Sequence, residues 1–107
     1  NYRIVSGSDP MELAHFENEI DLHIENLVND DKRRTNADIL RIQLTHFNHF
    51  LEKAIRLGVR STFVIHGLGK GKLKNEIATR LINHPEVKTF KNEYHPKYGF
   101  GATEIIF

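Results

Sequence analysis

One stretch of the chain restricts its fold more than any other, because a short apolar run passes through alternating glycines into a helical pattern. Residues 61–65 (STFVI) are β-branched, aromatic and apolar, which predicts a buried central strand. Glycines follow at positions 67, 69 and 71, and then apolar residues share one face of a predicted helix at positions 73, 77, 78 and 81. Pro85 ends that helix. A strand that leads directly into a helix favours an α/β fold.

The strongest helical pattern lies before this stretch. Thr35 or Asn36 can cap a helix, and Asp38 is favourable in its first turn. Gly58 stands where a left-handed residue ends a helix. Between these signals the apolar residues recur at three- and four-residue spacing and predict a core-facing stripe: Leu40, Leu44, Phe47, Leu51, and Ala54 with Ile55.

The remaining segments predict strands. Residues 19–24 alternate polar and apolar, with Ile20, Leu22 and Ile24 expected on one face. Residues 87–90 and 102–107 predict the last two strands. The order β-α-β-α-β-β predicts a two-layer α/β sandwich, in which two helices pack on one face of a mostly four-stranded sheet or flank it. We expect residues 1–18 to form a linker or N-terminal arm and residues 19–107 to form one domain.

Length and composition exclude several classes of protein. A chain of 107 residues is too short for two independent cores. It has no cysteine, which excludes a disulfide framework and a thiolate metal site. No apolar run approaches the ~20 residues that cross a bilayer. These features predict a cytoplasmic module with no membrane partner, and the start at Asn1 favours a piece of a longer protein.

Charge is divided unevenly along the chain. Residues 1–57 carry seven Lys/Arg and ten Asp/Glu, whereas residues 58–107 carry eight and four. The net charges of −3 and +4 indicate that a polyanion would meet the C-terminal half, although a difference of this size also arises by chance.

The glycine-rich loop, residues 66–72, is predicted to bind an anion. It lies at the carboxyl end of a strand, where ligands of open α/β sheets bind. Glycines let the backbone approach a phosphate, and Lys70, Lys72 and Lys74 add positive charge. The spacing matches neither a P-loop nor a dinucleotide fingerprint. A plain tight turn is the alternative interpretation, and a small phosphorylated molecule is a further candidate ligand.

A second candidate segment is Asp21-Leu22-His23. An acid and a histidine two apart on a strand point to the same side, where the carboxylate can orient the imidazole for acid–base work. The alternative interpretation is a solvated polar face of an edge strand.

Three segments together resemble the signature of the Smr (small MutS-related) domain family. They are Asp21-Leu22-His23, the run from His66 to Lys74 (HGLGKGKLK), and the run from Gly99 to Glu104 (GFGATE), and they occur in the family's order. The chain departs from the family at Ile24, where glycine is usual, and at residues 25–34, which look like an insertion. The resemblance implies a fold similar to the C-terminal domain of translation initiation factor 3 and a C-terminal position in a larger bacterial protein.

The resemblance also implies nucleic-acid binding, often with nicking or cleavage of DNA or RNA. The implied catalytic residues are Asp21, His23 and His66, with either histidine as the general base or acid. Phosphates would be bound by residues of the loop and of the last segment: Gly67, Gly69, Lys70, Gly71, Lys72, Lys74, Gly99 and Gly101. A binding module without catalysis, directed to nucleic acid or to the ribosome, is the alternative function. The need for a divalent metal is left open.

Two further groups of residues carry weaker signals. His46 and His49 share a helix face, but without a third ligand a solvated face accounts for them, and we predict no metal site. A mixture of aromatic and basic residues precedes the last strand and would either stack on bases or close the core: Tyr94, His95, Lys97, Tyr98 and Phe100.

Overall fold

The computed structural model describes residues 10–107 and confirms the predicted succession of strands and helices. The elements are α1 (Pro10–His15), β1 (Glu19–Asp21), a 3-10 helix η2 (Ile24–Asn26), α2 (Asn36–Leu57), β2 (Ser61–Ile65), α3 (Lys72–Ile82), β3 (Thr89–Lys91) and β4 (Ala102–Ile106). Apart from α1 and η2, this order is β-α-β-α-β-β.

The four strands form one mixed sheet in the order β1-β2-β4-β3. β1 runs parallel to β2, whereas β4 is antiparallel to both β2 and β3. The register places Asp21 opposite Ile65, and Ile65 opposite Ala102. The carboxyl ends of β1 and β2 therefore meet the beginning of β4 at one end of the sheet.

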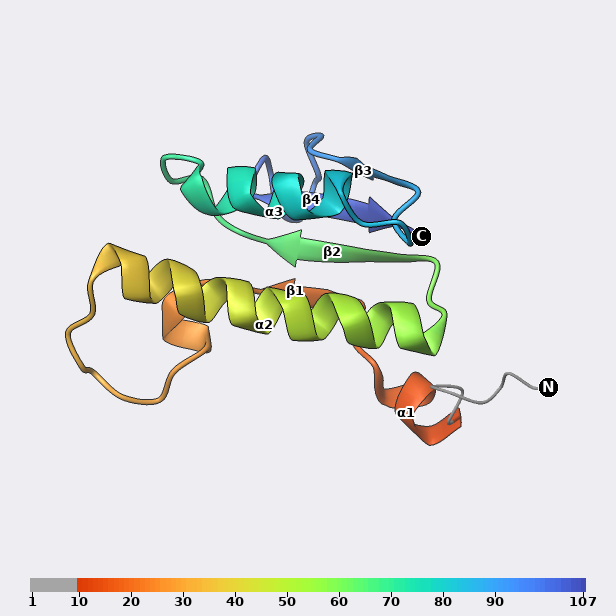
Figure 1. Ribbon diagram of the computed structural model, residues 1–107, viewed down its shortest axis with the longest axis horizontal. Coiled ribbons are helices and arrows are strands. Elements are labelled where there is room, and N and C mark those ends of the chain that lie inside the picture. The colour runs from red at the N-terminus through yellow and green to blue at the C-terminus, as the bar shows by residue number, and fades with distance from the viewer. Residues whose placement is uncertain (1–9) are drawn as a thin grey trace.

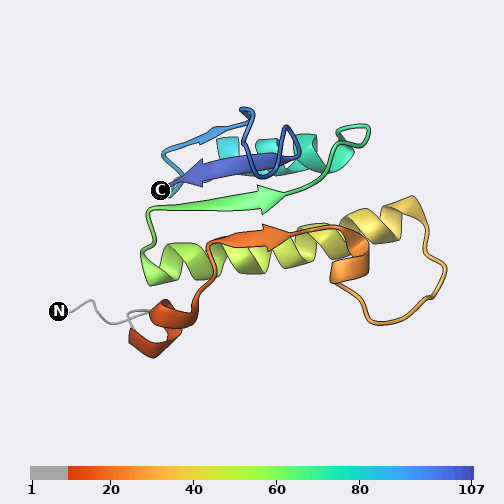
Figure 2. The same cartoon turned by 180° about the vertical axis from the view of Figure 1, so that it is seen from behind.

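Both long helices cover the same face of the sheet. In Figure 1 α2 and α3 lie in front of the strands, and in Figure 2 the strands lie in front of the helices. Phe47 of α2 and Ile77 of α3 are fully buried against Val64 and Ile105 of the sheet. The sandwich thus has two layers, as predicted, with a single face of the sheet covered by helices.

The ends of α2 follow the local signals in the sequence. The hydroxyl of Thr35 accepts a hydrogen bond from the backbone N–H of Asp38 at 3.1 Å, which satisfies a helix N–H that has no intrahelical partner. At the other end Gly58 adopts a φ of 74°, and its N–H donates to the carbonyl oxygens of Ala54 and Ile55.

Alternation along the strands separates two sets of side chains. Residues paired across strands share a face of the sheet. The helix-covered face carries buried residues: Thr62, Val64, Thr103 and Ile105. The opposite face carries residues that are less buried: Glu19, Asp21, Phe63 and Ile65.

Three predicted strands have different limits in the structure, and the last of them ends at Ile106 rather than at Phe107. The first was predicted over residues 19–24 but ends at Asp21, because the side chain of Asp21 accepts a hydrogen bond from the backbone N–H of His23 and turns the chain into η2. Ile24 therefore does not share a strand face with Ile20. The third strand begins at Thr89 rather than at Val87, whose N–H is bonded to the carbonyl of His84 in a turn.

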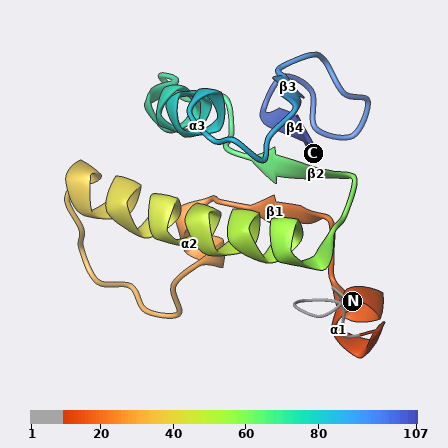
Figure 3. The ribbon, with the colours of Figure 1, turned by 45° about the vertical axis from the view of Figure 1, so that its right-hand side comes forward.

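Residues 10–18 contain a helix that the sequence patterns did not predict. Arg56 of α2 donates two hydrogen bonds to the carboxylate of Glu12, at 3.0 and 2.8 Å. The ring of Phe16 stacks on that of Phe50 with centroids 5.4 Å apart. Figure 3 shows α1 beside the C-terminal end of α2.

Residues 1–9 of the predicted arm lie outside the described residues, and the domain start at residue 19 stays a prediction. Among residues 10–107, no helix combines the length and apolar character needed to cross a membrane.

Candidate functional site

Three segments distant in the sequence meet at the end of the sheet where β1 and β2 finish. The backbone N–H groups of His66 and Gly67 both donate to the carbonyl of Gly101, at 2.9 and 3.0 Å. The N–H of Leu22 donates to the carbonyl of Ile65 at 2.9 Å. The glycine loop is therefore held between the end of β1 and the segment that enters β4.

Asp21 and His23 form a directly hydrogen-bonded pair. His23 Nδ1 lies 2.5 Å from Asp21 Oδ1, and Asn26 Nδ2 donates to Asp21 Oδ2 at 2.9 Å. Burial raises the pKa of Asp21, but hydrogen bonds from the His23 backbone, the His23 ring and Asn26 outweigh it and lower that pKa overall. An ionised carboxylate only accepts hydrogen bonds, so Nδ1 carries a proton and the neutral ring has its lone pair at Nε2.

The His23 ring lies against Gly67. A Cβ atom built at Gly67 would come within 2.9 Å of His23 Nε2, and Gly67 has a φ of +83°. Both the close approach and the left-handed backbone require glycine at this position. The loop and the Asp21–His23 pair are thus matched to one another in shape.

A hollow of about 470 Å³ opens beside this pair on the face of the sheet that the helices leave uncovered. Its other walls come from the loop and from the segment before β4: Ile65, Gly67, Leu68, Lys97, Tyr98 and Gly101. Glu19 anchors that segment, because it accepts hydrogen bonds from the Tyr98 hydroxyl and, at 3.2 Å, from Lys97 Nζ. The bond from Tyr98, with the charge of Lys97, lowers the pKa of Glu19.

His66 lies on the other side of the loop. Its Nδ1 is 3.0 Å from the Gly67 carbonyl, and its Nε2 is 2.9 Å from the hydroxyl of Thr103, which itself donates to Asn92 Oδ1. Burial lowers the pKa of His66 and favours the neutral ring. Both ring nitrogens of His66 therefore lie against groups of the protein, and a neutral ring can donate to one of these groups. In His23, by contrast, only Nδ1 has a hydrogen-bond partner among residues 10–107.

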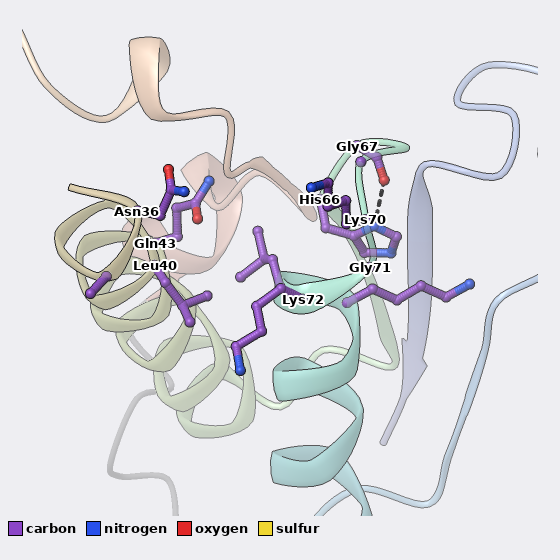
Figure 4. A pocket seen from close by; sticks show the side chains of 12 residues that line it. Asn36, Leu40, Gln43, His66, Gly67, Lys70, Gly71 and Lys72 are labelled. Carbon is purple, nitrogen blue, oxygen red and sulfur yellow. Dashed lines mark hydrogen bonds between the residues drawn. The ribbon is translucent and has the colours of Figure 1, made fainter. Parts of the chain in front are cut away.

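His66 borders a second cavity, of about 520 Å³, between the loop and α2. Figure 4 shows Asn36, Leu40 and Gln43 of α2 on one side of this cavity, with His66 and Lys72 on the other. Gln43 also donates to the carbonyl of Leu22 at 2.9 Å, which fixes the end of β1 on α2.

The predicted phosphate-binding residues are divided among these hollows. Lys70 and Lys74 border both the second cavity and a smaller hollow beside Phe100, whereas Lys72 borders the second cavity. Gly101 approaches Gly67 so closely that its Cβ would lie 3.4 Å from the Gly67 Cα. Gly99 does not line these hollows and instead bonds to His95 in a tight turn, with a φ of +63°.

The two helical histidines stay apart from this site. His46 and His49 are exposed on α2. Within residues 10–107 no group of three or more histidine, cysteine, aspartate or glutamate side chains is arranged to hold a metal ion.

Comparison with known proteins agrees with the geometry. The family model described as the Smr domain matches residues 42–107. The chain belongs to the Smr domain family. The match begins inside α2, so Asp21 and His23 precede the matched residues of this Smr domain.

Relatives and solved structures share the family and the fold. Endonuclease MutS2 of Aquifex aeolicus is 38% identical over 56 residues, which are 52% of this chain and 7% of that protein. Endonuclease MutS2 of Brevibacillus brevis is 28% identical over 101 residues, covering 78% of this chain and 13% of that protein. This Smr domain therefore spans a small part of the relatives it matches.

The solved structures that resemble it are also Smr proteins. The Smr domain of Thermus thermophilus MutS2 has a TM-score of 0.57 and 24% identity, over 82% of this chain and 94% of that one. YdaL, a stand-alone small MutS-related protein from Escherichia coli, has a TM-score of 0.58 and 17% identity, over 100% of this chain and 79% of that one. At these identities the likeness concerns the fold.

Sequence reasoning missed several residues that support the site of this Smr domain. Glu19 holds the segment before β4, and Asn26 holds Asp21. Asn92 accepts a hydrogen bond from Thr103, and Gln43 holds the end of β1. Glu19 alone carried a local signal, because it lies two residues before Asp21 on the same face of the strand. Asn26 is only five residues from Asp21 but reaches it through the turn of η2, and Asn92 and Gln43 act through contacts between separate segments, which no spacing in the sequence indicates.

Proposed function

We propose that this Smr domain binds nucleic acid at the glycine loop and cleaves its phosphodiester bonds at the Asp21–His23 pair. The observation that carries the proposal is the position of His23. The Nδ1 atom of His23 is hydrogen-bonded to the ionised carboxylate of Asp21, and its Nε2 atom lies against Gly67 in a hollow beside the glycine loop. Three lysines lie in or next to that loop: Lys70, Lys72 and Lys74.

His23 is our candidate for the general base. In the proposed step, Nε2 accepts the proton of the attacking oxygen, either of water or of the 2′-hydroxyl of RNA, as that oxygen bonds to phosphorus. The bond from phosphorus to the leaving oxygen breaks, and the leaving oxygen takes a proton from solvent. Asp21 orients the ring and stabilises the imidazolium that forms.

His66 has a positioning role in this proposal. Its two nitrogens contact the Gly67 carbonyl and Thr103, and burial favours its neutral form. These contacts support the loop from the side opposite His23. We therefore expect His66 to control the loop that holds the phosphate rather than to take the proton of the nucleophile.

Lysines of the loop supply the charge for binding. Lys70 is exposed at the tip of the loop, and Lys74 lies in the first turn of α3. Lys72 Nζ is 3.9 Å from Glu76, but the Lys72 side chain is 73% exposed and Glu76 is also paired with Arg80, so the charge of Lys72 stays available. An extended polyanion satisfies such spread charges better than one small phosphate does.

Cleavage is tested with a supercoiled plasmid and an end-labelled RNA, each with Mg²⁺, with Mn²⁺ or with a chelator. The expected result is cleavage by the wild-type domain and a loss of about 10²–10⁴-fold in His23→Ala. Asp21→Asn should also lower the rate. His49→Ala is the matched control, because His49 is exposed on α2 away from the hollow.

Binding is tested by the dependence of affinity on salt. The logarithm of the association constant should fall linearly with the logarithm of salt concentration, and Lys70→Ala should reduce that slope by about 1. Lys88→Ala is the control, since Lys88 lies beside Ile106 at the other end of β4. An equal effect of both substitutions would contradict a binding site at the loop.

The two halves of the proposal can fail separately. Wild-type binding without cleavage of either substrate would leave a binding module, directed to nucleic acid or to the ribosome. Cleavage that His23→Ala retains in full would exclude His23 as the base.

A further inference from the structure

An exposed pair of aromatic side chains lies beside the glycine loop and has no part in the proposed cleavage. Phe100 is 58% exposed and Tyr94 is 62% exposed, and their rings meet edge to face with centroids 5.3 Å apart. Two other rings of the same segment turn inward, because His95 and Tyr98 both pack on Phe63. Packing on Phe63, on the open face of the sheet, therefore accounts for His95 and Tyr98 but not for Tyr94 and Phe100.

The exposed ring of Phe100 shares a hollow with the loop. This hollow measures about 190 Å³ and is lined by Phe100, Leu68, Lys70, Lys74 and the loop glycines. Leu68 is 75% exposed at the loop tip and also borders the hollow that holds the Asp21–His23 pair. The side chain of Leu68 thus lies between the proposed cleavage site and the hollow that contains Phe100, Lys70 and Lys74.

These groups match the parts of a nucleotide. A nucleobase presents a flat π-face that stacks on an aromatic ring, and a phosphate is attracted by ammonium groups. The hollow on the opposite flank of Tyr94 is lined by Glu93 and Glu104 together with Lys91, so its charged side chains sum to −1, whereas Lys70 and Lys74 give the hollow beside Phe100 a charge of +2. Charge complementarity therefore favours a bound strand whose sugar-phosphate backbone lies beside Lys70 and Lys74, with one of its bases over the rings of Phe100 and Tyr94.

A base within a duplex keeps both of its faces covered by its neighbours, so it cannot stack on a protein ring without leaving the helix. We propose that Phe100, supported by Tyr94 and Leu68, is a stacking site for an unpaired base of the strand whose phosphates Lys70 and Lys74 bind. The inference rests on the proposed function and narrows its substrate class to single-stranded or locally unpaired nucleic acid.

The test compares three fluorescein-labelled probes of one length by anisotropy: a single strand, its perfect duplex, and the same single strand with abasic positions. The wild-type domain should bind the intact single strand most tightly. Phe100→Ala should weaken that binding roughly five- to 150-fold and leave duplex and abasic binding nearly unchanged. Phe100→Trp should retain the preference, because it keeps an aromatic face.

Ile82→Ala is the matched control, because Ile82 is a large apolar residue that is 71% exposed at the last position of α3. Circular dichroism verifies that each variant is folded. A 2-aminopurine base in the single strand gives a second readout, since its fluorescence should change on binding to the wild type and not on binding to Phe100→Ala.

Failure of this inference differs from failure of the proposed function. If Lys70→Ala weakens all probes while Phe100→Ala binds the single strand as tightly as the wild type does, the stacking site is wrong and nucleic-acid binding stands. Equal loss for intact and abasic strands also overturns stacking. If the wild type binds none of the probes, both proposals fall.

Discussion

Replacing Gly67 with alanine is expected to lower stability by a modest amount and to damage the site by a larger one. Gly67 has a φ of +83°, and a left-handed conformation costs an L-residue roughly 1–2 kcal/mol. For a domain of about this size, that cost lowers Tm by roughly 4–16 °C. Gly58 has a φ of +74°, and no atom of the described part of the chain other than its own neighbours lies within 4 Å of an added Cβ. Gly58→Ala should therefore show the backbone cost alone.

The additional effect of Gly67→Ala concerns His23. The new Cβ would lie 2.9 Å from His23 Nε2, a distance at which one of the two groups must move. The His23 side chain is 45% exposed, so its ring can turn away at little cost in folding free energy. Turning removes the bond between Nδ1 and Asp21, however. Gly67→Ala should thus resemble Gly58→Ala in stability and His23→Ala in cleavage.

Chemical denaturation and thermal unfolding measure the first effect, and plasmid nicking at a temperature where all variants are folded measures the second. Gly69→Ala is the control within the loop, because Gly69 has an ordinary φ and its added Cβ would meet no atom of residues 10–107 within 4 Å. The reasoning is refuted if Gly67→Ala keeps the Tm of the wild type. It is also refuted if Gly67→Ala and Gly69→Ala cleave equally well.

Three further predictions concern stability. Thr103→Val should cost about 1–3 kcal/mol in urea unfolding, because it removes the hydroxyl that contacts the half-buried His66 Nε2, whereas Thr62→Val should be neutral or stabilising, since the buried hydroxyl of Thr62 has no hydrogen-bond partner among residues 10–107. Burial lowers the pKa of His66 in the folded state, so the unfolded state binds more protons as pH falls through its ordinary pKa of about 6.5, and stability decreases as pH falls below about 7. Urea titrations at decreasing pH should show a weaker fall in His66→Gln, and an unchanged fall would contradict the assignment. Thr35→Ala should lose about 0.5–2 kcal/mol with the loss of the cap of α2, and equal midpoints for variant and wild type would show that the cap contributes nothing.

The helices could be predicted from the sequence because their signals are local. The cap at Thr35, the stop at Gly58 and the apolar stripe between them all act within a few residues of one another. The helix α1 escaped prediction for the opposite reason. Its six residues are held on α2 by Glu12 and by Phe16, which directly follows the helix, and the partners of these two residues lie 44 and 34 residues away.

The limit of the first strand shows how a local signal can be outweighed by another. Polar and apolar residues alternate up to Ile24, and that pattern predicts a longer strand. The side chain of Asp21 instead accepts a hydrogen bond from the backbone of His23, which competes with the sheet for the chain. The expected proximity of Asp21 and His23 is found in the structure, but it results from a turn rather than from a shared strand face.

The placement of His66 could not have been predicted, because it depends on the register of the sheet. Asp21 is paired with Ile65 and shares its face, so the next residue, His66, turns to the opposite side, under the loop. The three implied catalytic residues therefore do not surround one point. His23 contacts Gly67 from the open face, and His66 contacts the Gly67 carbonyl from the helix side. A single change at Gly67 consequently disturbs both histidines, whereas a change at either histidine leaves the contact of the other with the loop in place.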